Sequence, residues 1–127
     1  LENKSRKFES RWLPVKYKTP VSLKDTQLGI WVAHGEGRFE LSDAWQDDVE
    51  IIGQYTGSQY PYNPNGSAHD AIGLKAKWAN HYVIMPHPER SLFKWQCEYI
   101  PDELAEHYDG PYTPWIELFQ NLVNLVI

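Results

Sequence analysis

The hexapeptide MPHPER at residues 85–90 places the strongest local constraint on the backbone of this chain. Pro86 and Pro88 fix their own φ angles, and Pro88 also disfavours the helical region for His87. We therefore expect an extended segment. Side chains two residues apart in such a segment point to the same side, so His87 and Glu89 are predicted to project together. An imidazole beside a carboxylate is the base-and-orienter half of a nucleophilic triad, although such a pair also occurs by chance in ordinary loops.

Short apolar runs predict the strands of a sheet at residues 7–17, 28–33, 49–55, 71–74 and 82–85. The last run predicts a buried strand that delivers His87 to the edge of the sheet. Residues 41–48 and 102–106 are expected to form short helical turns. At the C-terminal end, Thr113 is a candidate cap and Pro114 suits the first helical position. An amphipathic helix packed on the sheet is predicted from the apolar positions Trp115, Ile116, Phe119, Leu122, Val123 and Val126.

Composition narrows the class of protein. The 127 residues fit one domain, and 42% hydrophobic content is enough for a core. No apolar run approaches the roughly 20 residues that span a bilayer, and the first residues lack a signal-peptide core. A net charge of -5 argues against nucleic acid as a partner. The single cysteine, Cys97, excludes an internal disulfide and a multi-cysteine metal site. We expect a soluble, cytoplasmic protein without a membrane partner.

Polar residues also collect after the run at 28–33. Gly35 and Gly37 allow a sharp turn or a close backbone approach that would hold His34 and Glu36 at the tip of the strand. The Gly-x-Gly pattern lacks the third glycine of a dinucleotide site. A tight turn with a capped histidine is the alternative interpretation. Residues 63–67 predict a further turn, in which Asn65-Gly66 favours a positive φ.

Five ordered blocks together resemble a known family. They are NKSRKFE at 3–9, WVAHGEGRF at 31–39, NPNGS at 63–67, MPHPER at 85–90 and PWIELFQN at 114–121. They are similar to the C-terminal part of the glutaminase domain of the phosphoribosylformylglycinamidine synthase family of purine biosynthesis. The resemblance implies an α/β fold: a partial class I glutamine amidotransferase (flavodoxin-like) domain over residues 1–127, with strands plus a C-terminal amphipathic helix.

The resemblance also implies a chemistry. In the family, a Cys-His-Glu triad hydrolyses glutamine, and the ammonia passes to a synthetase domain that uses ATP and magnesium; no cofactor is expected in this chain. His87 and Glu89 match the catalytic histidine and glutamate. The family's cysteine lies upstream in a glycine-flanked turn that is absent here, and Cys97 lacks such surroundings. We therefore expect a fragment that is inactive alone and that self-associates through apolar surface left by the missing N-terminal part.

Other matching positions carry weaker expectations. His34, Glu36 and Arg38 belong to a characteristic family loop, expected near the active-site cleft or the synthetase domain. Asn3 and Ser5 lie where related amidotransferases contact the glutamine backbone.

Two other functions remain open. A non-catalytic scaffold or interaction module would retain the fold without the nucleophile. A metal site would need the side chains of His34, Glu36, His87 and Glu89 to converge.

Overall fold

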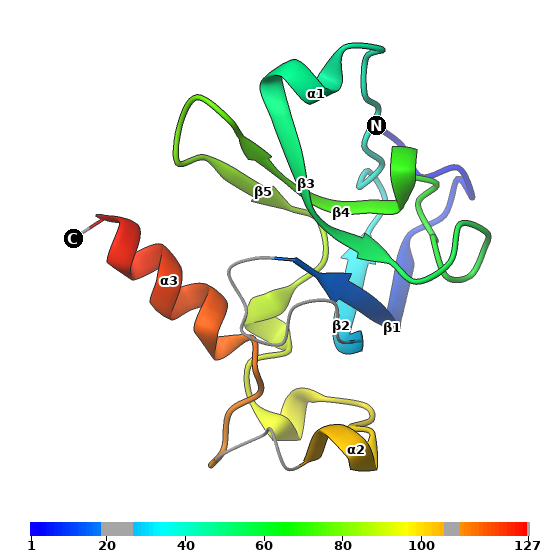
Figure 1. Cartoon of the computed structure of the whole chain (residues 1–127). Coiled ribbons are helices and arrows are strands. Elements are labelled where there is room, and N and C mark those ends of the chain that lie inside the picture. Colours follow the sequence, from blue (N-terminus) through cyan, green and yellow to red (C-terminus); the bar gives the residue numbers. More distant parts are fainter. Residues whose placement is uncertain (19–26, 106–109, 127) are drawn as a thin grey trace.

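The computed structural model describes residues 1–18, 27–105 and 110–126. Its centre is a five-stranded sheet in the order β2-β1-β3-β4-β5, and every strand pairing in these ranges is antiparallel (Figure 1). The strands are β1 (Glu9–Tyr17), β2 (Gln27–His34), β3 (Val49–Tyr55), β4 (Ala71–Ala76) and β5 (Tyr82–Ile84). The helices are α1 (Trp45–Asp48), α2 (Asp102–Ala105) and α3 (Ile116–Val126), with short 3-10 turns η1 (Ala68–Asp70), η2 (Pro88–Arg90) and η3 (Lys94–Gln96).

The predicted elements are largely confirmed, including the α/β class, all five strands and the short helices α1 and α2. Position 106 of the predicted helix lies outside the described residues. The burial of β5 was predicted wrongly: it is the last strand in the sheet order, and Val83 is 42% exposed. An apolar run of three or four residues does not by itself distinguish a central strand from an edge strand.

The sheet curls until its two edges approach each other beside the MPHPER segment. The Met85 N–H donates to the carbonyl of Ile72 on β4 at 2.9 Å, and two residues later the His87 N–H donates to Trp31 on β2 at 2.8 Å. His87 and Trp31 form an isolated antiparallel bridge. The segment therefore joins β4 to β2, which lie three places apart in the sheet order.

The core lies inside the curl. Alternate residues of β1, among them Leu13, Val15 and Tyr17, point into it. The Tyr17 ring packs edge-on against Trp115 at 5.2 Å, and Trp115 Nε1 donates to the Gly29 carbonyl at 2.8 Å. The residues just before α3 therefore attach the helix to β1 and β2.

α3 begins as predicted and buries only part of the predicted apolar stripe. The Trp115 N–H donates to Thr113 Oγ1 at 3.3 Å, so Thr113 caps the turn. Trp115 and Leu118 enter the core, whereas Val123 and Val126 of the predicted stripe are 53% and 87% exposed. Leu118 lies three residues after Trp115 and shares its face. Leu122 of the predicted stripe packs against the core, so only the C-terminal end of the stripe is exposed as α3 extends outwards (Figure 1). No helix in the described part of the chain is long and apolar enough to cross a membrane.

Candidate active site

His87 and Glu89 are joined by a short ion pair, with His87 Nδ1 2.6 Å from Glu89 Oε1. The backbone that achieves this differs from the predicted extended segment. His87 has φ −108° and ψ 84°, outside the helical region, and Pro88 begins the 3-10 turn η2, which is closed by the Arg90 N–H bonded to the His87 carbonyl at 3.1 Å. Pro88 has the φ that such a turn needs and no N–H to lose at its first position. The predicted contact between His87 and Glu89 is present, and the 3-10 turn brings the two side chains together.

The position of His87 is fixed by residues of β2 and by Ser91. Ser91 is fully buried, and its hydroxyl donates to the His87 carbonyl at 3.0 Å while accepting the Trp31 N–H at 3.1 Å. The second ring nitrogen, Nε2, lies 3.3 Å from the Ala33 carbonyl. The side chains of His87 and Glu89 are 25% and 56% exposed. The backbone that carries the His87–Glu89 pair, called the dyad below, is thus held by hydrogen bonds, while both side chains remain accessible to solvent.

A second histidine lies near the first. Ala33, the neighbour of His87 Nε2, directly precedes His34, and the charge of His87 contributes to lowering the pKa of His34. Burial is the main cause of that lower pKa, because it disfavours the charged imidazolium. The structure therefore brings His34 and His87 together at the end of β2.

Asn3 holds His34 in place. It is 1% exposed, and its Nδ2 donates to the carbonyls of His34 at 2.6 Å and Lys7 at 2.9 Å. Its Oδ1 accepts the Gly37 N–H and lies 3.2 Å from His34 Nδ1. Because every polar atom of its amide is engaged inside the protein, the side chain of Asn3 has no atom left for a substrate.

Two loops, residues 34–38 with the two glycines and residues 63–67, pack against this hydrogen-bond network. A Cβ built on Gly37 would lie 2.4 Å from His34 Nδ1, so the predicted close backbone approach occurs there. Asn65 Nδ2 donates to the Gly37 carbonyl at 2.6 Å, and Gly66 has the predicted positive φ of 72°. Residues 3–7, 34–38 and 63–67 therefore form one hydrogen-bonded assembly.

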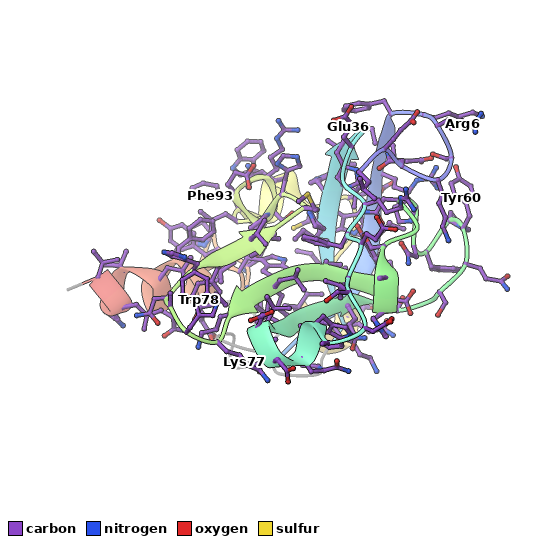
Figure 2. All side chains as sticks on the ribbon, turned by 90° about the horizontal axis from the view of Figure 1, so that it is seen from above. Arg6, Glu36, Tyr60, Lys77, Trp78 and Phe93 are labelled. Carbon is purple, nitrogen blue, oxygen red and sulfur yellow. The ribbon has the colours of Figure 1, made fainter. Side chains whose placement is uncertain are left out.

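The other residues that the sequence predicts for the site lie at the surface of this assembly. Arg38 Nε donates to the Glu2 carbonyl at 3.0 Å and ties down the N-terminal residues. Ser5 Oγ accepts a long hydrogen bond of 3.4 Å from the Lys7 N–H. Glu36 is exposed at the same end of the molecule as Arg6 and Tyr60 (Figure 2). The structure does not bring Glu36 or Arg38 into contact with the dyad through any bond in the described residues.

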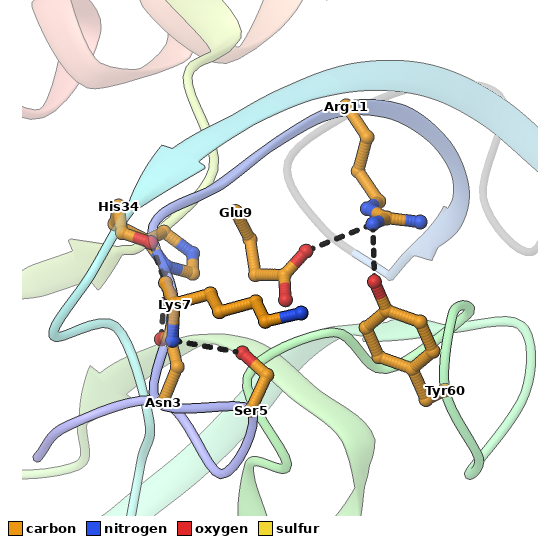
Figure 3. Close-up of polar contacts among 7 residues, drawn as sticks. All are labelled: Asn3, Ser5, Lys7, Glu9, Arg11, His34 and Tyr60. Atoms are coloured by element: carbon orange, nitrogen blue, oxygen red, sulfur yellow. Dashed lines mark hydrogen bonds and ion pairs between the residues drawn. The ribbon is translucent and has the colours of Figure 1, made fainter.

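Sequence reasoning missed a buried carboxylate. Glu9 is 3% exposed, and its Oε2 pairs with Arg11 Nη2 at 2.9 Å (Figure 3). Arg11 Nη2 also donates to the Tyr60 hydroxyl at 2.6 Å. A signal existed: Glu9 has the same parity as Leu13 and Val15, so the alternation of β1 places it on the inner face.

Cys97 has the properties of a structural cysteine. It is half-buried, its Sγ lies 3.7 Å from the Phe93 carbonyl, and burial raises its pKa to about 11. A thiol with so high a pKa supplies little thiolate at neutral pH. Within the described ranges, no group of three or more His, Cys, Asp or Glu side chains is arranged to hold a metal ion.

Comparison with known proteins identifies the family of the chain. Residues 1–126 match the model of the CobB/CobQ-like glutamine amidotransferase domain family. The chain belongs to this family. The amidotransferase domain is 37% identical over 140 residues to a phosphoribosylformylglycinamidine synthase of Drosophila melanogaster, covering 98% of this chain and 10% of the relative. It is 31% identical over 142 residues to the phosphoribosylformylglycinamidine synthase subunit PurQ of Methanococcus maripaludis, covering 96% of this chain and 52% of that subunit.

A solved structure shares the fold. The structure of PurLQS from Thermotoga maritima superposes with a TM-score of 0.66 at 24% identity, over 100% of this chain and 52% of that chain. The amidotransferase domain thus spans about half the length of the archaeal subunit and about a tenth of the insect protein.

Proposed function

We propose that this chain is the histidine- and glutamate-bearing half of a glutaminase domain in a phosphoribosylformylglycinamidine synthase acting in the cytoplasm. The observation that carries the proposal is the 2.6 Å pair between His87 and Glu89, held on a backbone bridged to β2. The relatives' names support the same reaction. The ATP and magnesium needed for the amidation of formylglycinamide ribonucleotide are assigned to the synthetase domain, not to this chain.

The proposed chemistry follows from the two ring nitrogens of His87. Glu89 accepts a hydrogen bond from Nδ1–H and stabilises the imidazolium, so Nε2 is the atom that removes the proton of a cysteine thiol supplied by the upstream half. The thiolate attacks the side-chain amide carbon of glutamine. His87 then donates the same proton from Nε2 to the leaving nitrogen, which departs as ammonia. Nε2 gives up its contact with the Ala33 carbonyl to take this role.

The test is glutamine hydrolysis by this chain alone and after mixing with a purified polypeptide that supplies the upstream half. We expect no hydrolysis alone and hydrolysis by the mixture. His87→Ala should lower the activity of the mixture by about 100- to 10,000-fold, because a general base contributes on that order. Glu50→Gln changes an exposed carboxylate on β3 and is the matched control, with unchanged activity expected.

Each other outcome has a distinct meaning. A mixture that stays fully active with His87→Ala would refute the assignment of the base. Activity of the chain without its complement would mean that a group within it is the nucleophile. No activity in the mixture, despite formation of the complex, would favour a non-catalytic scaffold.

A further inference from the structure

An open cavity lies between residues 4–7 and the loop that follows β3. It has a volume of about 410 Å³, and its lining includes Lys4, Ser5, Lys7, Tyr60 and Gly66. Sites for small molecules in proteins have volumes of roughly 300–1,000 Å³. No hydrogen bond or ion pair in the described residues joins this lining to the side chains of the dyad. The cavity therefore offers room for a small molecule outside the site already described.

The backbone of residues 3–7 brings two ammonium groups and a hydroxyl to this cavity. The Arg6 N–H donates to the Asn3 carbonyl at 2.9 Å, and Arg6 has a positive φ of 56°, so the chain turns between Ser5 and Lys7. Asn3 Nδ2 in turn holds the Lys7 carbonyl at 2.9 Å. As a result, Lys4, Ser5 and Lys7 line the same cavity.

The direction of the Lys4 side chain is set by Gly66. The Lys4 N–H donates to the Asn65 carbonyl at 3.1 Å. A Cβ built on Gly66 would lie 2.4 Å from Lys4 Cδ and 2.7 Å from Lys4 Cγ, so the aliphatic part of Lys4 lies on the glycine backbone. Part of the side-chain entropy of Lys4 is therefore lost on folding, before any ligand binds.

Tyr60 lies across the cavity and is held by Arg11. The guanidinium carbon of Arg11 is 4.9 Å from the centre of the Tyr60 ring, and Arg11 Nη2 donates to the Tyr60 hydroxyl at 2.6 Å. Because this hydroxyl accepts from Arg11, its own proton can be donated to a ligand. The Ser5 hydroxyl likewise accepts the Lys7 N–H and keeps its proton. The Lys7 ammonium group extends towards Tyr60 (Figure 3).

These donors have no carboxylate partner in the described part of the chain. Neither Lys4 nor Lys7 forms an ion pair there. The Glu9 carboxylate pairs with Arg11, and the Asp70 carboxylate accepts hydrogen bonds from two neutral side chains of the cavity lining. A chain of net charge -5 thus gathers two ammonium groups and two hydroxyl donors at one cavity. Such a set of donors suits an oxyanion with more than one negative charge.

We propose that this cavity binds a phosphate monoester, through the ammonium groups of Lys4 and Lys7 and the hydroxyls of Ser5 and Tyr60. A phosphate monoester has three terminal oxygens and carries nearly two negative charges at neutral pH, because its second pKa is about 6. A carboxylate carries one charge and would leave one lysine without a counter-charge. The rest of the cavity, beside the Tyr60 ring and Pro64, takes the organic part of the ligand. This site goes beyond the proposed function, because it has no step in glutamine hydrolysis.

The experiment is calorimetric titration of this chain at neutral pH with phenyl phosphate and with inorganic phosphate, each compared with sodium chloride at equal ionic strength. We expect saturable binding of one molecule of either phosphate, no binding of phenol, and an affinity for phenyl phosphate at least equal to that for inorganic phosphate. The amide resonances of Ser5, Lys7 and Gly66 should move over the same concentration range.

Three variants make the test specific. Lys4→Met and Lys7→Met each remove one positive charge and keep an unbranched side chain, so both should fold. Each should raise the Kd for phenyl phosphate by about 10-fold, the lower end of the range for a charge-assisted hydrogen bond, since both lysines are exposed. Lys16→Met, which removes an exposed lysine near the other end of β1, is the matched control and should leave the Kd unchanged.

An unchanged Kd in both Lys4→Met and Lys7→Met would overturn the proposal, as would an equal loss of affinity in Lys16→Met. Resonance changes confined to other surfaces would do the same. Binding of inorganic phosphate without phenyl phosphate would refute the monoester as the ligand. None of these measurements uses glutamine or the upstream half, so a failed glutaminase assay and a failed binding assay are independent results.

Discussion

Replacing Asn3 with aspartate should sharply destabilise the chain, although the two side chains have nearly the same shape. The change substitutes an oxygen for Nδ2, which donates to the carbonyls of His34 at 2.6 Å and Lys7 at 2.9 Å. The carbonyls of His34 and Lys7 then face a carboxylate oxygen, which cannot donate a hydrogen bond to them. An unsatisfied group of this kind costs about 1–3 kcal/mol, so the expected loss is about 2–6 kcal/mol. That is a large part of the roughly 5–15 kcal/mol by which a domain is normally stable.

Urea unfolding followed by tryptophan fluorescence measures this loss. With a urea m-value of about 2 kcal/mol/M, the midpoint for Asn3→Asp should fall by about 1–3 M while m stays unchanged. The loss in the free energy of unfolding of Asn3→Asp, relative to the original chain, should become smaller as the pH falls, because a protonated carboxyl regains one O–H to donate. Ser5→Ala is the control, since it removes only a 3.4 Å contact and should change stability by less than about 0.5 kcal/mol.

A loss below about 1 kcal/mol for Asn3→Asp would refute the reasoning, because it would mean that the donors of Asn3 are not needed inside the protein. The interpretation of Asn3 as a structural residue would then give way to the substrate contact that the family resemblance implies.

Three further outcomes are expected. The pKa of His34 lies below its ordinary value of 6.5, so the unfolded chain binds a proton more readily; stability present above pH 6.5 should decline as the pH falls below it, and His34→Gln should make the urea midpoint depend less on pH. Cys97, whose pKa rises from 9.0 to about 11, should react with iodoacetamide at pH 8 about 100 times more slowly than a free thiol, and equal rates would contradict its burial. Val123→Glu with Val126→Glu should reduce any self-association seen by sedimentation, because both side chains are exposed apolar positions of α3, whereas Gln120→Glu should not.

Local signals in the sequence were sufficient for the elements and for the dyad. The β3 prediction matches its observed bounds, and Thr113 caps the turn that leads into α3. The closure of the sheet had no such signal. It depends on the bridge between His87 and Trp31, which are 56 positions apart in the sequence. Pairing over such a separation leaves no local periodicity in the sequence.

The exposed end of α3 and the burial of Glu9 were harder to predict, for different reasons. Helical spacing identifies apolar positions but does not say how far along the helix the contact with the core extends, and here Trp115, Leu118 and Leu122 meet the core. The strand alternation did place Glu9 inwards, but a carboxylate in a core position conflicts with the usual burial preferences. Such a conflict between pattern and residue type is itself typical of functional sites.

The base and the acid of the proposed triad are anchored by neighbouring segments of the described chain. Within the described residues, His87 is fixed by the Trp31 carbonyl, the Ser91 hydroxyl and the Glu89 carboxylate. The base and its orienting acid are therefore formed before any upstream half binds, and the entropy of arranging them has already been lost on folding. The upstream half then has to supply only the cysteine and the groups that stabilise the developing oxyanion. If this reasoning is correct, restoring activity by mixing depends on docking of the two halves and on release of His87 Nε2 from the Ala33 carbonyl, and not on a change in the backbone that carries His87.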